Sequence, residues 1–276
     1  MESKDLTIVI VTFKSDEKVI NCLNSISNEI PIIIVENSSN KKFKSKIESS
    51  YHNVECILSG QNNGYSIANN IGLKRVKTKY ALVLNPDTIL SKDAIKNFLI
   101  TAEENKEFWL IGPANDQIGS SNFKDNLAEV KNLKGFAIFF NMSKFSNKFF
   151  DENFFLYFEE IDLCNQVIRK NGKIYLDQSI LINHQGASSV KDINKIELEK
   201  NRNWHWMWST FYYHKKYKGF FLALLIIIPN LLSALIKIIF YLITFNKNKK
   251  DIYYCRLSGI FNSIIGNKSW YRPSLD

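Results

Sequence analysis

The chain has 276 residues, of which 45% are hydrophobic and 13% aromatic, and its formal net charge is +9. This composition excludes a disordered protein and suits one α/β domain followed by an additional segment. Residues 191–276 hold 14 Lys and Arg against 5 Asp and Glu, whereas residues 1–190 hold 22 of each kind. The excess positive charge of the last third predicts an anionic partner there, either nucleic acid or a membrane surface.

The cysteines and the start of the chain bear on the cellular compartment. The four cysteines are scattered, with no CxxC pair and no metal-ligand spacing. They are typical of reduced thiols in a cytosolic protein rather than of a disulfide framework. The charged start, Met1–Asp5, leads straight into an apolar run, so we expect no signal peptide and a cytoplasmic location.

Strands and helices alternate along the first half of the chain. Apolar runs predict strands at Leu6–Phe13, Ile30–Val35, Val54–Leu58 and Tyr80–Leu84. Helical patterns are expected at Asp16–Ser27, from a capping Ser66 to about Val76, and from a capping Ser91 to about Glu104. Lys41–Lys46 is interpreted as a solvated basic loop. The alternation predicts βαβ units and a parallel sheet with right-handed crossovers.

The most informative strand is Tyr80–Leu84, because an uninterrupted apolar run ends there at Asn85-Pro86-Asp87. Pro86 cannot continue a strand ladder, so Asp87 is expected just past the carboxyl end of the strand. Ligands of open α/β sheets bind at that edge, and a carboxylate there can hold a divalent cation together with a diphosphate. The alternative is an ordinary surface turn followed by the N-cap of the next helix.

The second half of the chain has a different pattern. Strands are expected at Leu133–Asn141, Lys173–Leu176 and Ile180–Asn183, and an aromatic run at Asn153–Phe158 precedes a helix that opens at Glu159 and ends at Gly172.

Three side chains of this half can take part in chemistry. Glu159 and Glu160 suit the N-terminus of a helix through the helix dipole, and capping is their simplest explanation. A carboxylate beside aromatic surface also has a raised pKa, which suits a general base. His184 follows a predicted strand and is either a structural residue or a metal ligand.

The tail combines aromatic, basic and apolar segments. Phe220–Phe245 is almost wholly apolar and exceeds the about 20 residues that cross a bilayer. Because Pro229-Asn230 and Lys237 interrupt it, two shorter helices in the membrane interface are favoured over one span. The Trp and Tyr residues of Trp204–Tyr217 suit the headgroup layer, and flanking lysines suit anionic lipid. Two alternatives are a buried helical pair, packed on the first domain or in a homodimer, and an aromatic surface that stacks bases.

Several segments, in this order, resemble the family 2 glycosyltransferases with a GT-A fold. They are Ile8–Phe13, Val35–Ser39, Asn62–Tyr65 with Ala68–Gly72, Leu84–Thr88, and Phe150–Glu152 with Phe154–Cys164. In particular they resemble the bacterial rhamnosyltransferase-like branch that builds surface polysaccharides. The resemblance implies an α/β fold of the GT-A (Rossmann-like) type, with a mostly parallel central sheet flanked by helices, over residues 1–200. Residues 201–276 would then form a helical, membrane-associating C-terminal extension.

The resemblance also implies an activity and a set of site residues. The activity is that of a metal-dependent inverting glycosyltransferase of the hexosyltransferase class. It would move a sugar from dTDP-rhamnose or a UDP-sugar to a hydroxyl of a lipid-linked glycan. The residues that correspond to the nucleotide-sugar site are Thr12, Glu36, Asn63, Gly64, Asn85 and Asp87. Asp87 and His184 correspond to ligands of Mg²⁺ or Mn²⁺, and Glu160 corresponds to the catalytic base, with Glu159 as the second choice.

Two positions depart from the family pattern. Glu36 stands where the family usually has Asp and is one methylene longer. Asn85 stands where many members have the first Asp of the metal-binding motif, and this substitution removes one charge from the metal site.

Two other classes of protein are weighed against this assignment. A nucleotidyl- or phospho-sugar enzyme would have a Gly-rich loop after the first strand, and Thr12–Ser15 is not one. A non-catalytic membrane or nucleic-acid-binding adapter with a degenerate transferase domain is disfavoured by the presence of Asp87, Glu160 and His184. We therefore expect a nucleotide-sugar donor, a glycan or lipid-linked acceptor and a membrane surface as partners, and no nucleic acid. The expected location is the inner face of the cell membrane.

Overall fold

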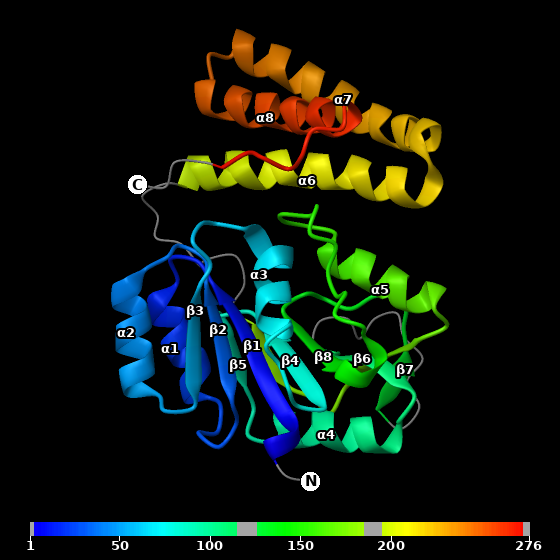
Figure 1. The fold of residues 1–276 in the computed structure, drawn as a ribbon. Coiled ribbons are helices and arrows are strands. Elements are labelled where there is room, and N and C mark those ends of the chain that lie inside the picture. The colour runs from blue at the N-terminus through cyan, green and yellow to red at the C-terminus, as the bar shows by residue number, and fades with distance from the viewer. Residues whose placement is uncertain (1–2, 115–125, 185–194, 273–276) are drawn as a thin grey trace. The chain divides into compact units, whose positions relative to one another are not determined.

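The computed structural model describes residues 3–114, 126–184 and 195–272. The chain divides into two compact units (Figure 1). The first unit comprises Met1–Asp151 and Glu160–Val190, and the second comprises Glu152–Glu159 and Lys191–Asp276. The boundary expected near residue 200 lies inside helix α6 (Lys195–Lys218).

The first unit is built on an eight-stranded sheet in the order β3-β2-β1-β4-β8-β6-β9-β7 (Figure 1). The strands are β1 (Leu6–Thr12), β2 (Ile32–Glu36), β3 (Val54–Leu58), β4 (Tyr80–Leu84), β6 (Phe108–Pro113), β7 (Leu127–Glu129), β8 (Ala137–Asn141) and β9 (Lys173–Asp177). Strands β1 to β4 pair with one another in parallel, whereas β8 runs antiparallel to both β4 and β6. The predicted α/β fold with a mostly parallel sheet flanked by helices is confirmed.

Helices cover both faces of this sheet. They are α1 (Asp16–Asn24), α2 (Lys41–Ser50), α3 (Gly64–Leu73), α4 (Ala94–Glu104) and α5 (Glu159–Arg169), with short 3-10 turns at Ser3–Asp5 and Met142–Lys144. Side chains of α1, α2 and α4 share one buried core with alternate residues of β1, such as Ile8 and Ile10. Val9, which points to the other face, packs with Leu73 of α3 and with Leu163 and Val167 of α5.

Three local predictions are wrong. Lys41–Lys46 is not a loop but the first part of α2, because Asn40 Oδ1 accepts the Phe43 N–H at 3.0 Å and Phe43 is buried in the core. Ser66 does not cap a helix, because α3 begins earlier, at Gly64, and Ser66 is buried inside it. Ser91 is not a cap either, since Asp93 holds that position in α4.

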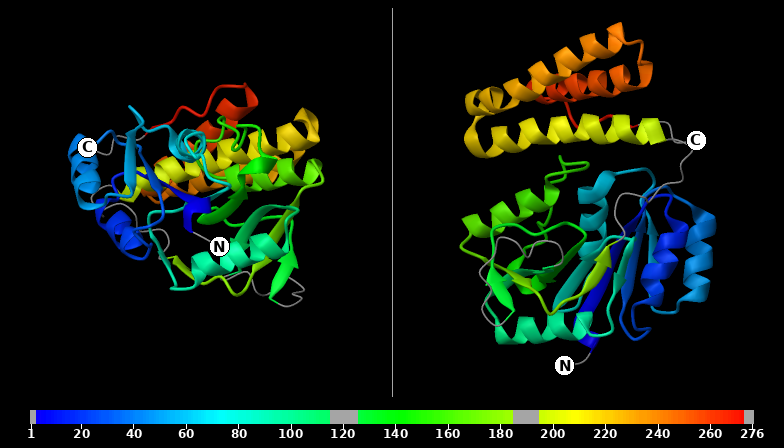
Figure 2. Two further views of the ribbon diagram at one scale, coloured as in Figure 1. Left: turned by 60° about the horizontal axis from the view of Figure 1, so that its bottom comes forward. Right: turned by 180° about the vertical axis from the view of Figure 1, so that it is seen from behind.

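The second unit contains three long helices that lie side by side (Figures 1 and 2). They are α6, α7 (Phe220–Ile243) and α8 (Lys247–Ile264). The prediction of two short apolar helices is wrong, because α7 is continuous through Pro229. A proline inside a helix costs about 3 kcal/mol. Packing against the neighbouring helices offsets this cost, since Ala223 and Ile227 form one buried cluster with Phe211 and Ile260.

The outward side of α7 remains apolar and exposed. Its largest exposed side chains are Phe221, Leu222, Leu225, Ile228, Leu232, Leu235, Ile236, Ile239, Phe240, Leu242 and Ile243. Among the described residues, α7 is the one helix that is long and apolar enough to cross a membrane, and only 17% of its most apolar window is buried.

Part of the aromatic segment is buried, contrary to expectation. Trp204 is fully buried and its Nε1 donates to Ser258 Oγ at 3.1 Å, while Trp208 Nε1 donates to the Asn267 carbonyl at 3.0 Å. These indoles hold α6 against the C-terminal part of the chain. The expectation that they lie in the headgroup layer, and the alternative that they stack on bases, are therefore wrong for Trp204 and Trp208.

Candidate active site

The carboxyl ends of the parallel strands bring the first predicted site residues to one edge of the sheet. Thr12, the last residue of β1, pairs in register with Glu36, the last residue of β2. Ile10 pairs with Leu84, the last residue of β4, so the Asn85–Asp87 turn leaves the sheet at the same edge. Thr12 is itself buried, and its hydroxyl lies 2.8 Å from the hydroxyl of Ser15.

Glu36 shapes the turn that follows β2. Its side chain is 1% exposed, and its carboxylate accepts hydrogen bonds from the backbone N–H groups of Ser38 and Asn40 and from the Ser38 hydroxyl. A carboxylate offers about four lone-pair positions. These three bonds therefore fix the orientation of the Glu36 carboxylate at the end of β2.

Asn37, which the sequence analysis did not select, organises the loop before α3. Its Oδ1 accepts the Asn63 N–H at 3.0 Å and the Ser59 hydroxyl at 2.9 Å, while its Nδ2 donates to the Gly64 carbonyl at 3.1 Å. Gly64 has a φ of +76°, a conformation that glycine adopts without strain. The predicted residues Asn63 and Gly64 are thus held beside the end of β2 by a neighbour of Glu36.

A two-stranded ribbon brings Asp87 and His184 together. Strand β10 (Ile182–His184) runs antiparallel to β5 (Thr88–Leu90), with His184 opposite Thr88. As a result His184 Nε2 lies 3.4 Å from Asp87 Oδ1, and the Asp87 side chain is 7% exposed. The two predicted metal ligands therefore form a pair.

Phe136 extends this pair and was also missed. Its ring stacks on the His184 imidazole with the centroids 4.7 Å apart and the planes at 9°. Its carbonyl accepts the Asn85 N–H at 2.8 Å, which ties the Asn85–Asp87 turn to the start of β8. Ligand pockets in proteins measure about 300–1,000 Å³. The cavity found beside His184 measures about 550 Å³ and is lined by Ile89, Leu90, Ser91, Lys134, Phe136, Leu181, Ile182, Asn183 and His184.

Glu160, in the first turn of α5, lies against the residue before Phe136. A Cβ added to Gly135 would lie 3.6 Å from Glu160 Cβ, and the Gly135 carbonyl accepts the Tyr65 hydroxyl at 2.6 Å. Gly135 and Phe136 therefore connect the predicted base to the Asp87–His184 pair.

The electrostatics of Glu160 agree with the expected direction. Burial raises the pKa of Glu160 above its ordinary value, and the N–H groups of Glu160 and Ile161 at the start of the helix oppose this shift. Glu159 is 6% exposed.

The donor atoms present fit a divalent cation. Among the described residues no group of three or more His, Cys, Asp or Glu side chains converges, and of the predicted ligands Asp87 and His184 lie together as a pair. Donor atoms 3.4 Å apart can share a cation bound at about 2.1 Å from each. Mg²⁺ is commonly bound by one or two carboxylates together with phosphate oxygens, Mn²⁺ accepts the same oxygen ligands, and imidazole is a common ligand of transition metals. The pair therefore suits a metal whose coordination is completed by a diphosphate.

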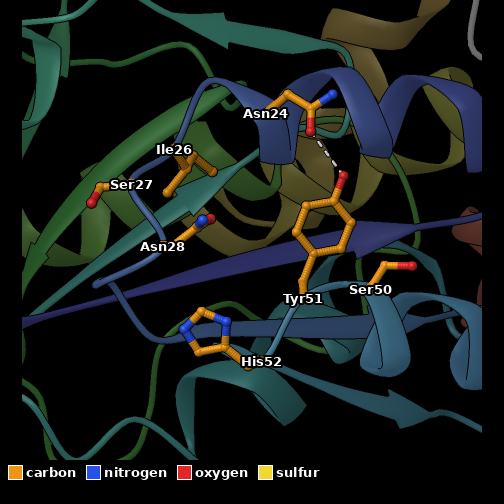
Figure 3. Close-up of a pocket in the computed structure, with 7 residues that line it drawn as sticks. All are labelled: Asn24, Ile26, Ser27, Asn28, Ser50, Tyr51 and His52. Atoms are coloured by element: carbon orange, nitrogen blue, oxygen red, sulfur yellow. Dashed lines mark hydrogen bonds between the residues drawn. The ribbon is translucent and has the colours of Figure 1, made fainter.

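A second cavity lies at the opposite edge of the sheet (Figure 3). It measures about 380 Å³ and is lined by Asn24, Ile26, Ser27, Asn28, Ser50, Tyr51 and His52. These residues precede β2 and β3, so they lie at the amino ends of the strands, where Tyr51 Oη donates to Asn24 Oδ1 at 2.8 Å (Figure 3). None of the predicted site residues lines this cavity.

The sheet and the residues at its carboxyl edge define a GT-A protein. The chain belongs to Glycosyl transferase family 2, whose sequence model matches residues 7–164.

One characterised relative is the low-salt glycan biosynthesis hexosyltransferase Agl10 of Haloferax volcanii. It is 29% identical over 195 residues, which cover 60% of this chain and 62% of that protein. The chain thus spans about three fifths of the length of this curated relative.

Two solved structures share the fold. The crystal structure of S. aureus TarS has a TM-score of 0.52 at 16% identity, over 63% of this chain and 35% of that one. The crystal structure of GalNAc-T7 with UDP, GalNAc and Mn²⁺ has a TM-score of 0.56 at 10% identity, over 69% of this chain and 45% of that one.

Proposed function

We propose that the protein is an inverting, metal-dependent hexosyltransferase of polysaccharide biosynthesis, similar to the rhamnosyltransferase-like branch of its family. It transfers a sugar from dTDP-rhamnose or a UDP-sugar to a hydroxyl of a lipid-linked glycan. The observation that carries this proposal is the connection, through Gly135 and Phe136, of Glu160 to the Asp87–His184 pair. The hexosyltransferase name of the Haloferax relative supports the same class of reaction.

The proposed chemistry assigns one proton transfer to Glu160. An acceptor hydroxyl attacks the anomeric carbon of the donor, the bond from that carbon to the diphosphate breaks, and Glu160 takes the hydroxyl proton. A base whose pKa is raised by burial holds this proton better than an exposed carboxylate does. A single displacement inverts the anomeric configuration and requires no second nucleophile.

The other residues bind the donor. Thr12, Glu36, Asn63 and Gly64 surround the nucleoside, and Asn85 and Asp87 face its diphosphate. Asp87 and His184 would hold Mg²⁺ or Mn²⁺, and the metal would supply positive charge to the departing nucleoside diphosphate. The GalNAc-T7 structure, which contains UDP and Mn²⁺, supports this choice of metal by fold alone.

We also propose that the second unit attaches the protein to the cytoplasmic face of the cell membrane. The exposed apolar side of α7 supports this, with Phe221 at 81% and Ile236 at 66% exposure. Lysines flank the helix at both ends, with Lys215, Lys216 and Lys218 before it and Lys247, Lys249 and Lys250 after it. Apolar surface bordered by lysines matches the acyl and headgroup layers of an anionic membrane.

Helix α7 is proposed to lie in the interface rather than to span the bilayer. It packs on both α6 and α8, and a span would draw these two helices and their charged side chains into hydrocarbon. The arrangement also accounts for lysines at both ends, which the positive-inside rule disfavours for a single crossing. Attachment in this way raises the local concentration of a lipid-linked acceptor.

The donor is identified by screening nucleotide-sugars for thermal stabilisation of the full chain, with and without Mn²⁺. The expected result is stabilisation by one donor class that depends on Mn²⁺, because a ligand that binds only the folded state raises its stability. Transfer of the labelled sugar from that donor to a membrane lipid extract is the second measurement. Absence of both stabilisation and transfer for every nucleotide-sugar would contradict the proposal.

A further inference from the structure

The aromatic run before α5 belongs to the second unit and lies along α6. Asn153 Nδ2 donates to the Tyr212 hydroxyl at 2.9 Å, and the Phe154 ring meets the Tyr212 ring edge-on at 5.0 Å. The Leu156 carbonyl accepts the Ser209 hydroxyl at 2.9 Å.

The last two residues of the run contact the same side of α6. Tyr157 meets Trp206 at 5.2 Å between ring centroids, and Phe158 meets Trp206 at 5.4 Å and Tyr213 at 5.2 Å. Trp206, Ser209 and Tyr213 are spaced by three and four residues, so they form one face of the helix. Each residue from Asn153 to Phe158 therefore contacts α6. The contact of Phe155 is with His205 of that helix.

Phe155 is enclosed between α6 and the end of the chain. Its ring stacks on the His205 imidazole at 4.4 Å, and the Arg272 guanidinium lies over the ring at 3.4 Å from its centroid. His205 is fully buried, and its two ring nitrogens lie 2.8 Å from Ser269 Oγ and 2.9 Å from the Tyr271 carbonyl. The C-terminal segment therefore fixes His205 and Phe155 at once.

The backbone just before α5 adopts a conformation that these residue types avoid. Tyr157 has a φ of +71° and Phe158 a φ of +70°, and neither is glycine. Two consecutive bulky residues in the left-handed region are strained, and such a conformation persists only where the surroundings over-determine it. The contacts of Tyr157 and Phe158 with Trp206 and Tyr213 supply that determination.

We propose that α6 is the positioning element for the entrance of α5, and that Trp206 is its principal positioning residue. By holding Tyr157 and Phe158 in the left-handed region, Trp206 fixes the direction in which the chain enters the first turn of α5, where Glu160 stands. This inference rests on the proposed role of Glu160 as the base. It assigns to the C-terminal unit a part in catalysis that is separate from membrane attachment.

The test compares single variants of the full chain. Trp206 is 46% exposed, so Trp206→Ala leaves no sealed cavity. Loss of contacts that hold a strained segment is expected to speed amide exchange of residues 153–160 by about 10-fold or more. The same variant is expected to lower kcat by about 10-fold or more with the donor Kd unchanged, because a misplaced base affects the transition state and not donor binding. Trp206→Phe, which keeps an aromatic ring, restores both quantities.

Two further variants test whether the effect is specific to the contacts between residues 153–158 and α6. Ser209→Ala removes the hydrogen bond to Leu156 without changing the aromatic face, and it shifts exchange and kcat in the same directions by less. Tyr254→Ala is the matched control, because Tyr254 is an aromatic side chain of α8 in the same unit and is 66% exposed. It leaves exchange of residues 153–160 and kcat at the values of the unaltered chain.

If residues 153–160 of Trp206→Ala exchange their amide protons at the rate of the unaltered chain, the inference is overturned. Faster exchange with an unchanged kcat overturns it as well. A chain that transfers no sugar, yet shows the expected exchange pattern in the variants, contradicts the proposed function alone.

Discussion

Two opposing effects act on the Glu160 carboxyl. Its place at a helix N-terminus favours the charged form, whereas its burial favours the neutral form. Burial is the larger effect, so the pKa of Glu160 lies above that of an exposed glutamate. A base acts only when deprotonated, and the transfer rate is therefore expected to fall as the pH drops through this raised pKa. The acidic limb of the kcat profile lies at higher pH than the titration of an exposed glutamate.

Glu160→Gln is expected to lower kcat by about 10²–10⁴-fold and to remove that acidic limb, while the donor Kd stays unchanged. The neighbouring Glu159→Gln is the matched control and keeps the limb. If Glu159→Gln is inactive and Glu160→Gln is active, the roles of the two glutamates are exchanged. The measurement is the pH dependence of initial transfer rates for the three proteins.

Asp87 and His184 are expected to respond differently to substitution. Asp87→Asn keeps the size of the side chain but removes its charge, so it abolishes transfer and Mn²⁺-dependent donor binding while the melting temperature changes little. His184→Ala raises the Mn²⁺ concentration needed for half-maximal activity. His52→Ala, at the cavity on the opposite edge of the sheet, is the control. Normal metal titration of His184→Ala would assign His184 a structural role beside Phe136.

Some site residues could be predicted from the sequence and others could not. Asp87 was predictable because a strand that stops at a proline leaves a visible pattern. Its proximity to His184 depends on the pairing of β5 with β10, and strands this short leave a weak signal. Asn37 acts through a network of amide hydrogen bonds, and Phe136 acts through a ring stacked on an imidazole. Neither interaction produces a periodic pattern in the sequence, so both residues were missed. Asn37 lies inside the Val35–Ser39 motif, which is the signal that could have identified it.

At the level of elements, apolar runs identified β1, β2 and β4 because these strands are buried on both faces. The same reasoning failed for α2, whose lysines conceal the two buried residues Phe43 and Ile47. It also failed for α7, where tertiary packing overrides the local effect of Pro229. The strands β6 and β7 were not predicted at all.

Helix α8 packs closely on α6 at Gly259. A Cβ at this position would lie 2.3 Å from the Trp204 carbonyl oxygen, which belongs to rigid backbone. In an exposed helix, Gly→Ala stabilises by about 1 kcal/mol, whereas here Gly259→Ala is expected to destabilise by about 1–3 kcal/mol through overpacking. Denaturant unfolding followed by Trp fluorescence measures this, because four of the five tryptophans (Trp204, Trp206, Trp208 and Trp270) lie in the second unit.

Asn248→Ala, at an exposed position of the same helix, is the control for helix propensity and leaves stability equal or slightly higher. A stabilising effect of Gly259→Ala would contradict the close approach of α8 to Trp204.

For the whole molecule, the prediction concerns membrane attachment. The full chain is expected to float with anionic liposomes, less at high salt because screening weakens the lysine contacts. Ile236→Glu places a charge on the exposed apolar side of α7 and abolishes flotation, whereas Ser49→Glu, at an exposed position of α2 in the first unit, adds the same charge and does not.

If the unaltered chain does not float but forms a dimer that Ile236→Glu dissociates, a second copy covers α7 and the lipid-linked acceptor loses support. Light scattering on the same samples distinguishes this homodimer from the lipid-bound monomer.

The second unit is discontinuous in sequence, since Glu152–Glu159 joins it from within the first unit. A truncation after residue 190 would therefore remove the α6 contacts of Asn153–Phe158 and leave Phe154 and Phe155 uncovered. The two units are not interchangeable modules: an engineer who grafts this C-terminal region onto another transferase must carry the segment before α5 with it. The same dependence predicts that substitutions in Asn153–Phe158 and in α6 accumulate together during evolution.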